Sequence, residues 1–175
     1  MKKITLINPL RLFLSLTLLL AFSYAADAQD KQVTTFILVR HAEKVADGSK
    51  DPELSEIGKA RALRLANMLK KQSIAAIYST NYKRTMNTVK PLADQLGQTI
   101  LQYEPFKDEE IVKMVNEHKG KTVVIVGHSN NIPWIANTLL GKKEFGDYDE
   151  SYYENVLIVN VIEKGVNGST LQISY

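Results

Sequence analysis

A short apolar run that ends abruptly in polar residues constrains this chain more than any other feature. Phe36 to Val39 are all apolar, and Arg40 and His41 follow at once. A run of this length and composition is typical of a buried strand. Ligands of open α/β sheets bind outside the carboxyl ends of the strands. The sequence therefore predicts a functional site around His41.

A second predicted strand ends in the same way. Thr122 to Val126 form the strongest strand candidate, and His128 follows after one glycine. A third strand, predicted at Ile74 to Tyr78, is followed about one helical turn later by Arg84. If these strands are parallel neighbours, their carboxyl ends meet at one edge of the sheet. That edge would then gather two cations and two imidazoles: Arg40, His41, Arg84 and His128.

Helical patterns alternate with these strands. Apolar residues recurring every three or four positions predict four helices, over about 55–71, 79–97, 108–119 and 132–140. Ser55 is the expected N-cap of the first helix. The second helix, which starts at residues 79–81 and ends at Gly97, should have a kink or break at Pro91. Further strands are predicted at 99–103, 156–162 and 169–174, the last two as a hairpin, with a surface loop over 142–154. This order predicts an α/β fold, a three-layer sandwich with a mainly parallel central sheet.

The first 28 residues are typical of a signal peptide. Lys2, Lys3 and Arg11 precede a short apolar run over 12–22, and small residues follow up to Ala28. We expect cleavage after Ala28 or, alternatively, after Ala25, which leaves 29–175 as one exported domain, periplasmic or secreted. An uncleaved membrane anchor is the alternative, but the apolar run is short for a bilayer. We expect no stable membrane anchor after cleavage.

Charge and cysteine content exclude several classes of function. The 175-residue chain has a formal charge of +3, of which the predicted leader contributes +2. The remaining charge of about +1 does not indicate a nucleic-acid partner. The chain has no cysteine, which excludes disulfides, thiolate zinc sites and cysteine nucleophiles.

The predicted cluster of cations and imidazoles suits a phosphorylated ligand. Arginine holds phosphate oxygens in a bidentate manner. An imidazole whose attacking nitrogen is unprotonated can attack phosphorus. A phosphorylated small molecule is therefore the expected partner, and the leaving oxygen would need a proton.

Four motifs make the chain resemble a known family. They are Arg40-His41-Ala42-Glu43-Lys44, Leu54-Ser55-Glu56-Ile57-Gly58, Ser79-Thr80 with Arg84-Thr85 and Thr88, and Val126-Gly127-His128-Ser129. In this combination and order they resemble the histidine phosphatase superfamily, whose fold is that of cofactor-dependent phosphoglycerate mutases. The chain is short and is similar to the compact branch that includes small phosphohistidine phosphatases.

The resemblance implies roles for several residues. His41 would be the nucleophile that carries the phosphoryl group, and Arg40, Arg84 and His128 would bind phosphate, with no metal or cofactor. The proton donor does not follow the family pattern; Glu104 is the first choice from its position at a strand end, and Asp108 the second. Three further residues are candidate substrate contacts: Ser55, which is also a candidate helix cap, and Glu43 and Lys44, which would otherwise pair in solvent.

The sequence therefore predicts an exported, metal-independent phosphohydrolase that acts through a phosphohistidine on His41. A non-catalytic module that binds phosphorylated ligands is the main alternative. A metallohydrolase is disfavoured because no H-x-H or H-E-x-x-H spacing occurs. Sugar phosphates, nucleotides, inositol phosphates and phosphoproteins all remain possible substrates.

Overall fold

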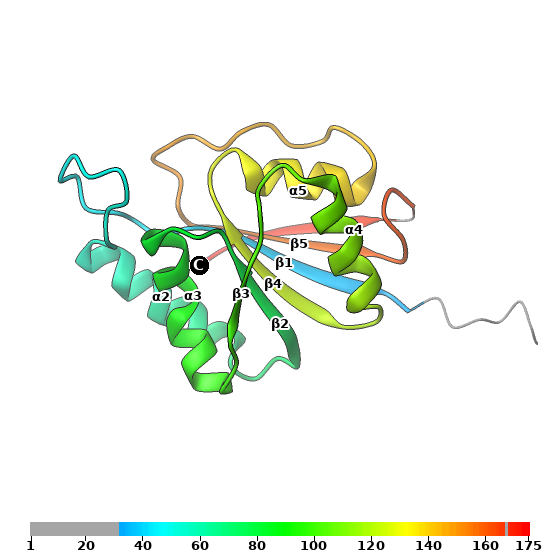
Figure 1. Ribbon diagram of the computed structural model, residues 1–175, viewed down its shortest axis with the longest axis horizontal. Helices are drawn as coiled ribbons and strands as arrows, with labels where there is room; N and C mark the ends of the chain where they lie inside the picture. The colour runs from blue at the N-terminus through cyan, green and yellow to red at the C-terminus, as the bar shows by residue number, and fades with distance from the viewer. Residues whose placement is uncertain (1–31, 167) are drawn as a thin grey trace, which may run out of the picture. The chain divides into compact units, whose positions relative to one another are not determined.

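Strands and helices alternate along the chain, as the sequence predicts (Figure 1). The computed structural model describes residues 32–166 and 168–175, so the signal peptide predicted at 1–28 lies outside the described residues. Within these ranges, no helix has the length and apolar character needed to cross a bilayer.

One six-stranded sheet forms the centre of the described part. Its strands are β1 (Thr34–Arg40), β2 (Ile74–Ser79), β3 (Ile100–Gln102), β4 (Thr122–Gly127), β5 (Asn155–Val161) and β6 (Ser169–Ser174), in the order β3-β2-β4-β1-β5-β6. The four strands β3, β2, β4 and β1 run parallel, whereas β5 and β6 add an antiparallel hairpin at one edge. This confirms the mainly parallel sheet and the final hairpin.

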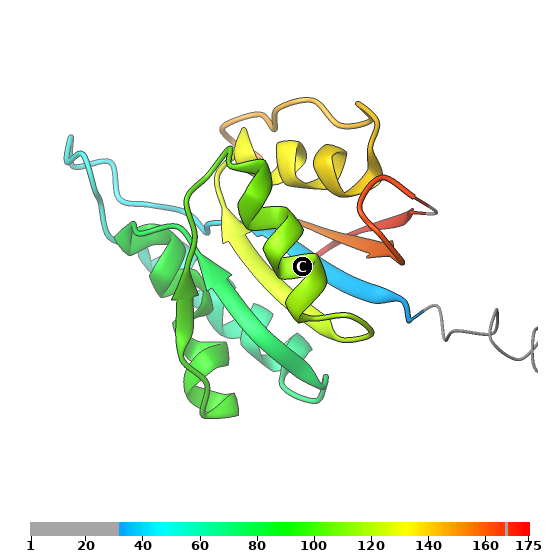
Figure 2. The same ribbon diagram turned by 45° about the vertical axis from the view of Figure 1, so that its right-hand side comes forward.

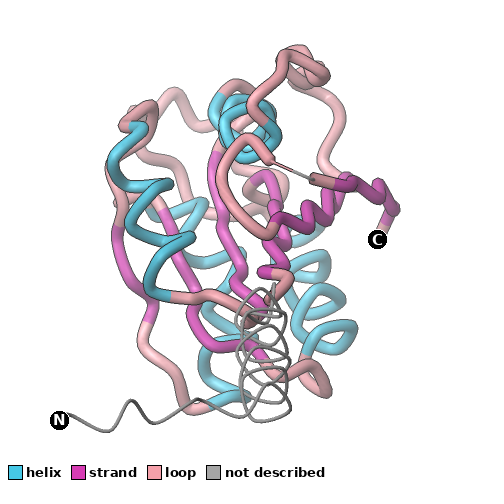
Figure 3. Tube along the Cα trace, turned by 90° about the vertical axis from the view of Figure 1, so that its right-hand side faces the viewer, coloured by secondary structure: helices cyan, strands magenta, loops and turns pink. Residues whose placement is uncertain are grey.

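Helices cover both faces of this sheet (Figures 2 and 3). Helices α2 (Glu56–Leu69) and α3 (Lys83–Leu96) pack on one face, and α4 (Asp108–Glu117) and α5 (Asn131–Leu140) on the other. Successive residues of a strand point to opposite faces. Accordingly, Phe36 and Leu38 pack with α4 and α5, whereas Ile37 and Val39 pack with α2 and α3. The predicted three-layer α/β sandwich is confirmed.

The ends of the helices agree with the sequence in part. Ser55 is the N-cap of α2, because its hydroxyl accepts a hydrogen bond from the amide of Gly58. Helix α3 begins at Lys83, later than expected, and it is not broken at Pro91. Val89 and Leu92, on either side of this proline, are fully buried in the core. Their packing keeps the segment helical although proline removes one backbone donor.

Candidate active site

His41 lies directly after β1, beside the end of β4. The register pairs Arg40 with Gly127, and the amide of His41 donates to the carbonyl of Gly127 at 2.8 Å. The ring nitrogen Nδ1 lies 2.8 Å from the carbonyl oxygen of Ala42. Because a carbonyl only accepts hydrogen bonds, Nδ1 must carry the proton in the neutral ring. The other nitrogen, Nε2, then keeps a free lone pair, as a nucleophile requires.

The surroundings of His41 keep its ring neutral. Burial lowers the pKa of His41 to about 3, and the hydrogen bond to Ala42 only partly opposes this. The neighbouring charges of His128, Arg40 and Arg84 lower the pKa further. A buried imidazole loses hydration that would stabilise its charged form, so it remains neutral at pH 7.

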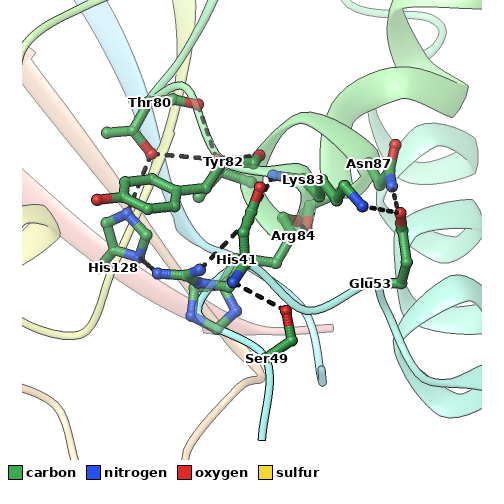
Figure 4. Close-up of polar contacts among 12 residues, drawn as sticks. His41, Ser49, Glu53, Thr80, Tyr82, Lys83, Arg84, Asn87 and His128 are labelled. Atoms are coloured by element: carbon green, nitrogen blue, oxygen red, sulfur yellow. Dashed lines mark hydrogen bonds and ion pairs between the residues drawn. The ribbon is translucent and has the colours of Figure 1, made fainter. Parts of the chain in front are cut away.

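His128 occupies the corresponding place after β4, and the two imidazole rings lie 5.4 Å apart between centroids (Figure 4). The amide of His128 donates to Oδ1 of Asn131, at 2.5 Å. The ring nitrogen Nε2 lies 3.1 Å from Oγ1 of Thr80, and Nδ1 lies 3.4 Å from Nη2 of Arg84. Burial, followed by the charges of Arg84 and Arg40, lowers the pKa of His128 to about 4.

Arg84 reaches this pair of histidines from the first turn of α3 (Figure 4). Its guanidinium lies 4.4 Å from the ring centroid of Tyr82 and 3.6 Å from a carboxylate oxygen of Asp51. One turn later, the hydroxyl of Thr88 donates to the carbonyl of Arg84 and accepts the amide of Ala42 at 2.9 Å. Thr88 thus ties the backbone next to His41 to the helix that carries Arg84.

These side chains line one open pocket of about 380 Å³. Its lining includes four of the residues expected at the site: His41, Lys44, Arg84 and His128. Two cations and two neutral imidazoles therefore face the same space. Cationic side chains in a partly desolvated pocket of this size suit a phosphate group.

Arg40 lies beside this pocket rather than in its lining. Its side chain is fully buried, and its terminal nitrogens donate to the carbonyls of Asp149 (2.8 Å), Tyr152 (3.0 Å) and Glu150 (3.1 Å). The ring of Tyr153 stacks on the guanidinium at 4.2 Å. Arg40 therefore holds the loop between α5 and β5, and a direct phosphate contact from Arg40 stays a prediction.

Other expected site residues are engaged elsewhere. The carboxylate of Glu43 forms a bidentate pair with Arg61, with distances of 2.7 to 3.0 Å, and the side chains are only 19% and 12% exposed. Glu43 is therefore paired with Arg61 and is absent from the pocket lining, and a substrate contact from Glu43 stays a prediction. Ser55 serves as the cap of α2, away from the pocket lining.

The two candidate proton donors also lie outside the pocket lining. Glu104 is exposed, and Asp108 forms an ion pair with Lys164 at the start of α4. Glu104 nevertheless lies next to the pocket along the chain, because Pro105 and Phe106, the two residues that follow it, line the pocket. A lining position for the carboxylate of Glu104 or Asp108 is not observed.

Sequence reasoning missed the carboxylate that does line the pocket, that of Glu150. It is the single acidic side chain among the lining residues that the structure describes. Its only signal in the sequence is an acidic residue in a tyrosine-rich loop. Tyr82 was also missed, and its ring lies 5.1 Å from that of His128. Among residues 32–166 and 168–175, no three acidic or histidine side chains gather as a candidate metal site.

Comparison with known proteins agrees with this geometry. Residues 36–111 match the family model of the histidine phosphatase superfamily (branch 1). Phosphoglycerate mutase-like protein 4 of Arabidopsis thaliana is 33% identical over 79 residues, which cover 41% of this chain and 34% of that protein. The match therefore spans about a third of the length of this curated relative.

Solved structures with the same fold cover most of the chain. The protein histidine phosphatase SixA, complexed with tungstate, aligns with a TM-score of 0.64 at 16% identity, over 80% of this chain and 96% of that chain. A mycobacterial glucosyl-3-phosphoglycerate phosphatase aligns with a TM-score of 0.63 at 14% identity, over 82% and 99%. YhfR of Bacillus stearothermophilus aligns with a TM-score of 0.58 at 21% identity, over 72% and 90%.

At these identities the structural matches show the fold, whereas the family model adds the sequence pattern around His41 and Arg84. Together they agree with what the four motifs indicated: residues 36–111 have the sequence pattern of the histidine phosphatase superfamily, and the described part of the chain has the fold of small phosphatases of known structure.

Proposed function

We propose that this chain is a phosphomonoesterase that transfers the phosphoryl group of its substrate to Nε2 of His41 and from there to water. The observation that carries the proposal is the state of His41. Its Nδ1–H donates to Ala42, its pKa is about 3, and its ring lines a pocket beside Arg84 and His128. These features together support a neutral nucleophile aimed at a bound phosphate.

The proposed reaction proceeds in two steps. Nε2 of His41 attacks phosphorus, and the bond from phosphorus to the leaving oxygen breaks. Water then attacks the phosphohistidine, which releases inorganic phosphate and restores His41. Arg84 and Lys44 stabilise the negative charge on the phosphoryl oxygens, as cations do in other phosphoryl-transfer sites. No step in this scheme requires a metal, so turnover should persist in EDTA and should be inhibited by vanadate.

The test is detection of the covalent intermediate. Wild-type protein is mixed with 4-nitrophenyl phosphate, quenched at alkaline pH to preserve phosphohistidine, and analysed by peptide mass spectrometry. We expect a phosphoryl group on the peptide that contains His41 and none in His41→Asn. His118→Asn is the matched control, because His118 bonds to Tyr78 and is absent from the pocket lining.

The outcomes separate the alternatives that the sequence left open. Full turnover in His41→Asn would refute the proposal. Binding of phosphate esters without turnover or adduct in wild type would favour a non-catalytic binding module. Activity that disappears with chelator and returns with zinc would favour a metallohydrolase.

We also propose that the protein is exported after removal of residues 1–28. The support is the order of basic residues, apolar run and small residues at the start of the chain. Mass spectrometry of the N-terminus after expression of the full chain in a bacterial host with an export pathway should find Gln29, or Ala26 for the alternative cut. An intact Met1 in the membrane fraction would refute cleavage.

A further inference from the structure

The loop between α5 and β5, residues 141–154, is fastened to the pocket at several points. The buried Arg40 donates to three of its carbonyls, those of Asp149, Glu150 and Tyr152. The amide of Tyr148 donates to the carbonyl of Ser129, beside His128, at 2.9 Å. Because these partners belong to the ends of β1 and β4, the loop takes its position from the same strand ends that position the two histidines.

These hydrogen bonds place the side chain of Glu150 at the pocket. One carboxylate oxygen accepts the hydroxyl of Ser129 at 2.6 Å, and the other accepts Nη2 of Arg40 at 3.0 Å. The side chain is nevertheless 73% exposed, so water reaches the carboxylate. The bond from Ser129, together with the positive charges of Arg40 and Lys44, lowers the pKa of Glu150, which keeps the carboxylate ionised at neutral pH.

We propose that Glu150 is the general base that activates the hydrolytic water in the second step of the reaction. The proposal rests on the phosphohistidine mechanism given above. Glu150 is the one carboxylate in the pocket lining among the described residues, and it faces the space beside His41. An ionised carboxylate that is fixed by two hydrogen bonds and open to water is suited to accept a proton. The exposed Glu104 lacks such a position.

The proton and bond changes balance over the cycle. In the second step, the water oxygen bonds to phosphorus, the bond from phosphorus to Nε2 of His41 breaks, and the water proton moves to the carboxylate of Glu150. The exposed carboxylate then releases this proton to bulk water, and in the next first step the leaving oxygen of the substrate takes a proton from bulk water as its bond to phosphorus breaks. The carboxylate is thereby regenerated, and no further reactant is required.

An aryl phosphate isolates the second step, because a nitrophenolate leaves without help from an acid. We therefore compare wild type and Glu150→Gln with 4-nitrophenyl phosphate in a stopped-flow instrument. In the glutamine variant the amide oxygen can still accept the bond from Arg40, and the amide nitrogen can donate to the hydroxyl of Ser129, so both contacts of the loop can persist. The glutamine cannot accept a proton from water.

In Glu150→Gln we expect a rapid burst of about one nitrophenolate per protein, followed by turnover reduced about 10²- to 10⁴-fold, the usual contribution of a general base. Phosphohistidine at position 41 should accumulate in the same samples. Glu154→Gln, which removes an exposed carboxylate from the same loop, should retain the wild-type rate without accumulation. Matching melting temperatures would show that both variants are folded.

Wild-type turnover in a folded Glu150→Gln variant would refute the proposed role of Glu150 as general base. Loss of both burst and adduct would refute it as well, because it would place Glu150 in binding or in the first step. If wild type itself forms no adduct on His41, the proposed function fails instead. The two failures are therefore distinguishable in one set of experiments.

Discussion

Thr88→Val removes one hydroxyl that joins the backbone next to His41 to the helix that carries Arg84. The hydroxyl of Thr88 accepts the amide of Ala42 at 2.9 Å and donates to the carbonyl of Arg84 at 2.7 Å. Both Ala42 and Thr88 are fully buried, so water cannot replace the lost acceptor. Valine has nearly the same shape as threonine, so the change leaves no cavity.

The loss of stability in Thr88→Val depends mainly on the amide of Ala42, which is left without a hydrogen-bond acceptor. A buried donor without a partner costs about 1–3 kcal/mol, which corresponds to a fall in melting temperature of about 2–12 °C for a domain of this size. The carbonyl of Arg84 contributes less, because it also lies in a helix and keeps its backbone partner. We also expect a lower kcat, because the carbonyl of Ala42 holds the proton of His41.

Urea and thermal unfolding of wild type, Thr88→Val and Thr88→Ser measure this effect. Thr88→Ser keeps the hydroxyl and loses only a buried methyl group, worth about 0.8 kcal/mol. We expect the valine variant to be the less stable of the two, with the lower activity. If Thr88→Val is as stable as Thr88→Ser, the hydrogen bond to Ala42 does not anchor the loop, and the reasoning is refuted.

Three further predictions follow from the same region. The pKa of His41 falls from 6.5 to about 3 on folding, so between these pH values the unfolded chain binds a proton that the folded chain does not. The free energy of unfolding should therefore decrease as pH falls below about 6.5, by up to about 1.4 kcal/mol per pH unit. Urea midpoints at pH 7 and pH 5 test this, and an equal decrease in His41→Asn would contradict it. Gly58→Ala should destabilise by about 1–3 kcal/mol, because its Cβ would lie 2.1 Å from the carbonyl oxygen of Glu43, whereas Gly146→Ala meets nothing within 4 Å and should be neutral. Glu43→Gln should lower the melting temperature but leave KM unchanged, because the carboxylate of Glu43 pairs with Arg61. A raised KM with an unchanged melting temperature would instead indicate that Glu43 contacts the substrate.

Local patterns in the sequence were sufficient for the fold and for part of the site. Strands that are apolar on both faces and helices with apolar stripes carry strong signals, because burial of these faces drives the assembly of the sheet. His41 and His128 follow such strands directly, so once β1 and β4 pair in parallel, their proximity follows from the backbone alone. The glycine of the Leu54–Gly58 motif also gains a physical reason, because α2 approaches the backbone of Glu43 too closely for a side chain.

Tertiary structure decided where the long polar side chains of the site point. The sequence placed Arg40 at the correct strand end, yet its guanidinium binds carbonyls 109 to 112 residues further along the chain. Glu43 finds Arg61 on α2 in place of the pocket. Glu150 comes from a loop without periodicity, and its carboxylate reaches the pocket only because Arg40 and Ser129 hold it there. Backbone position follows from local hydrophobic pattern, whereas the direction of a flexible charged side chain depends on partners that only the folded chain brings within reach.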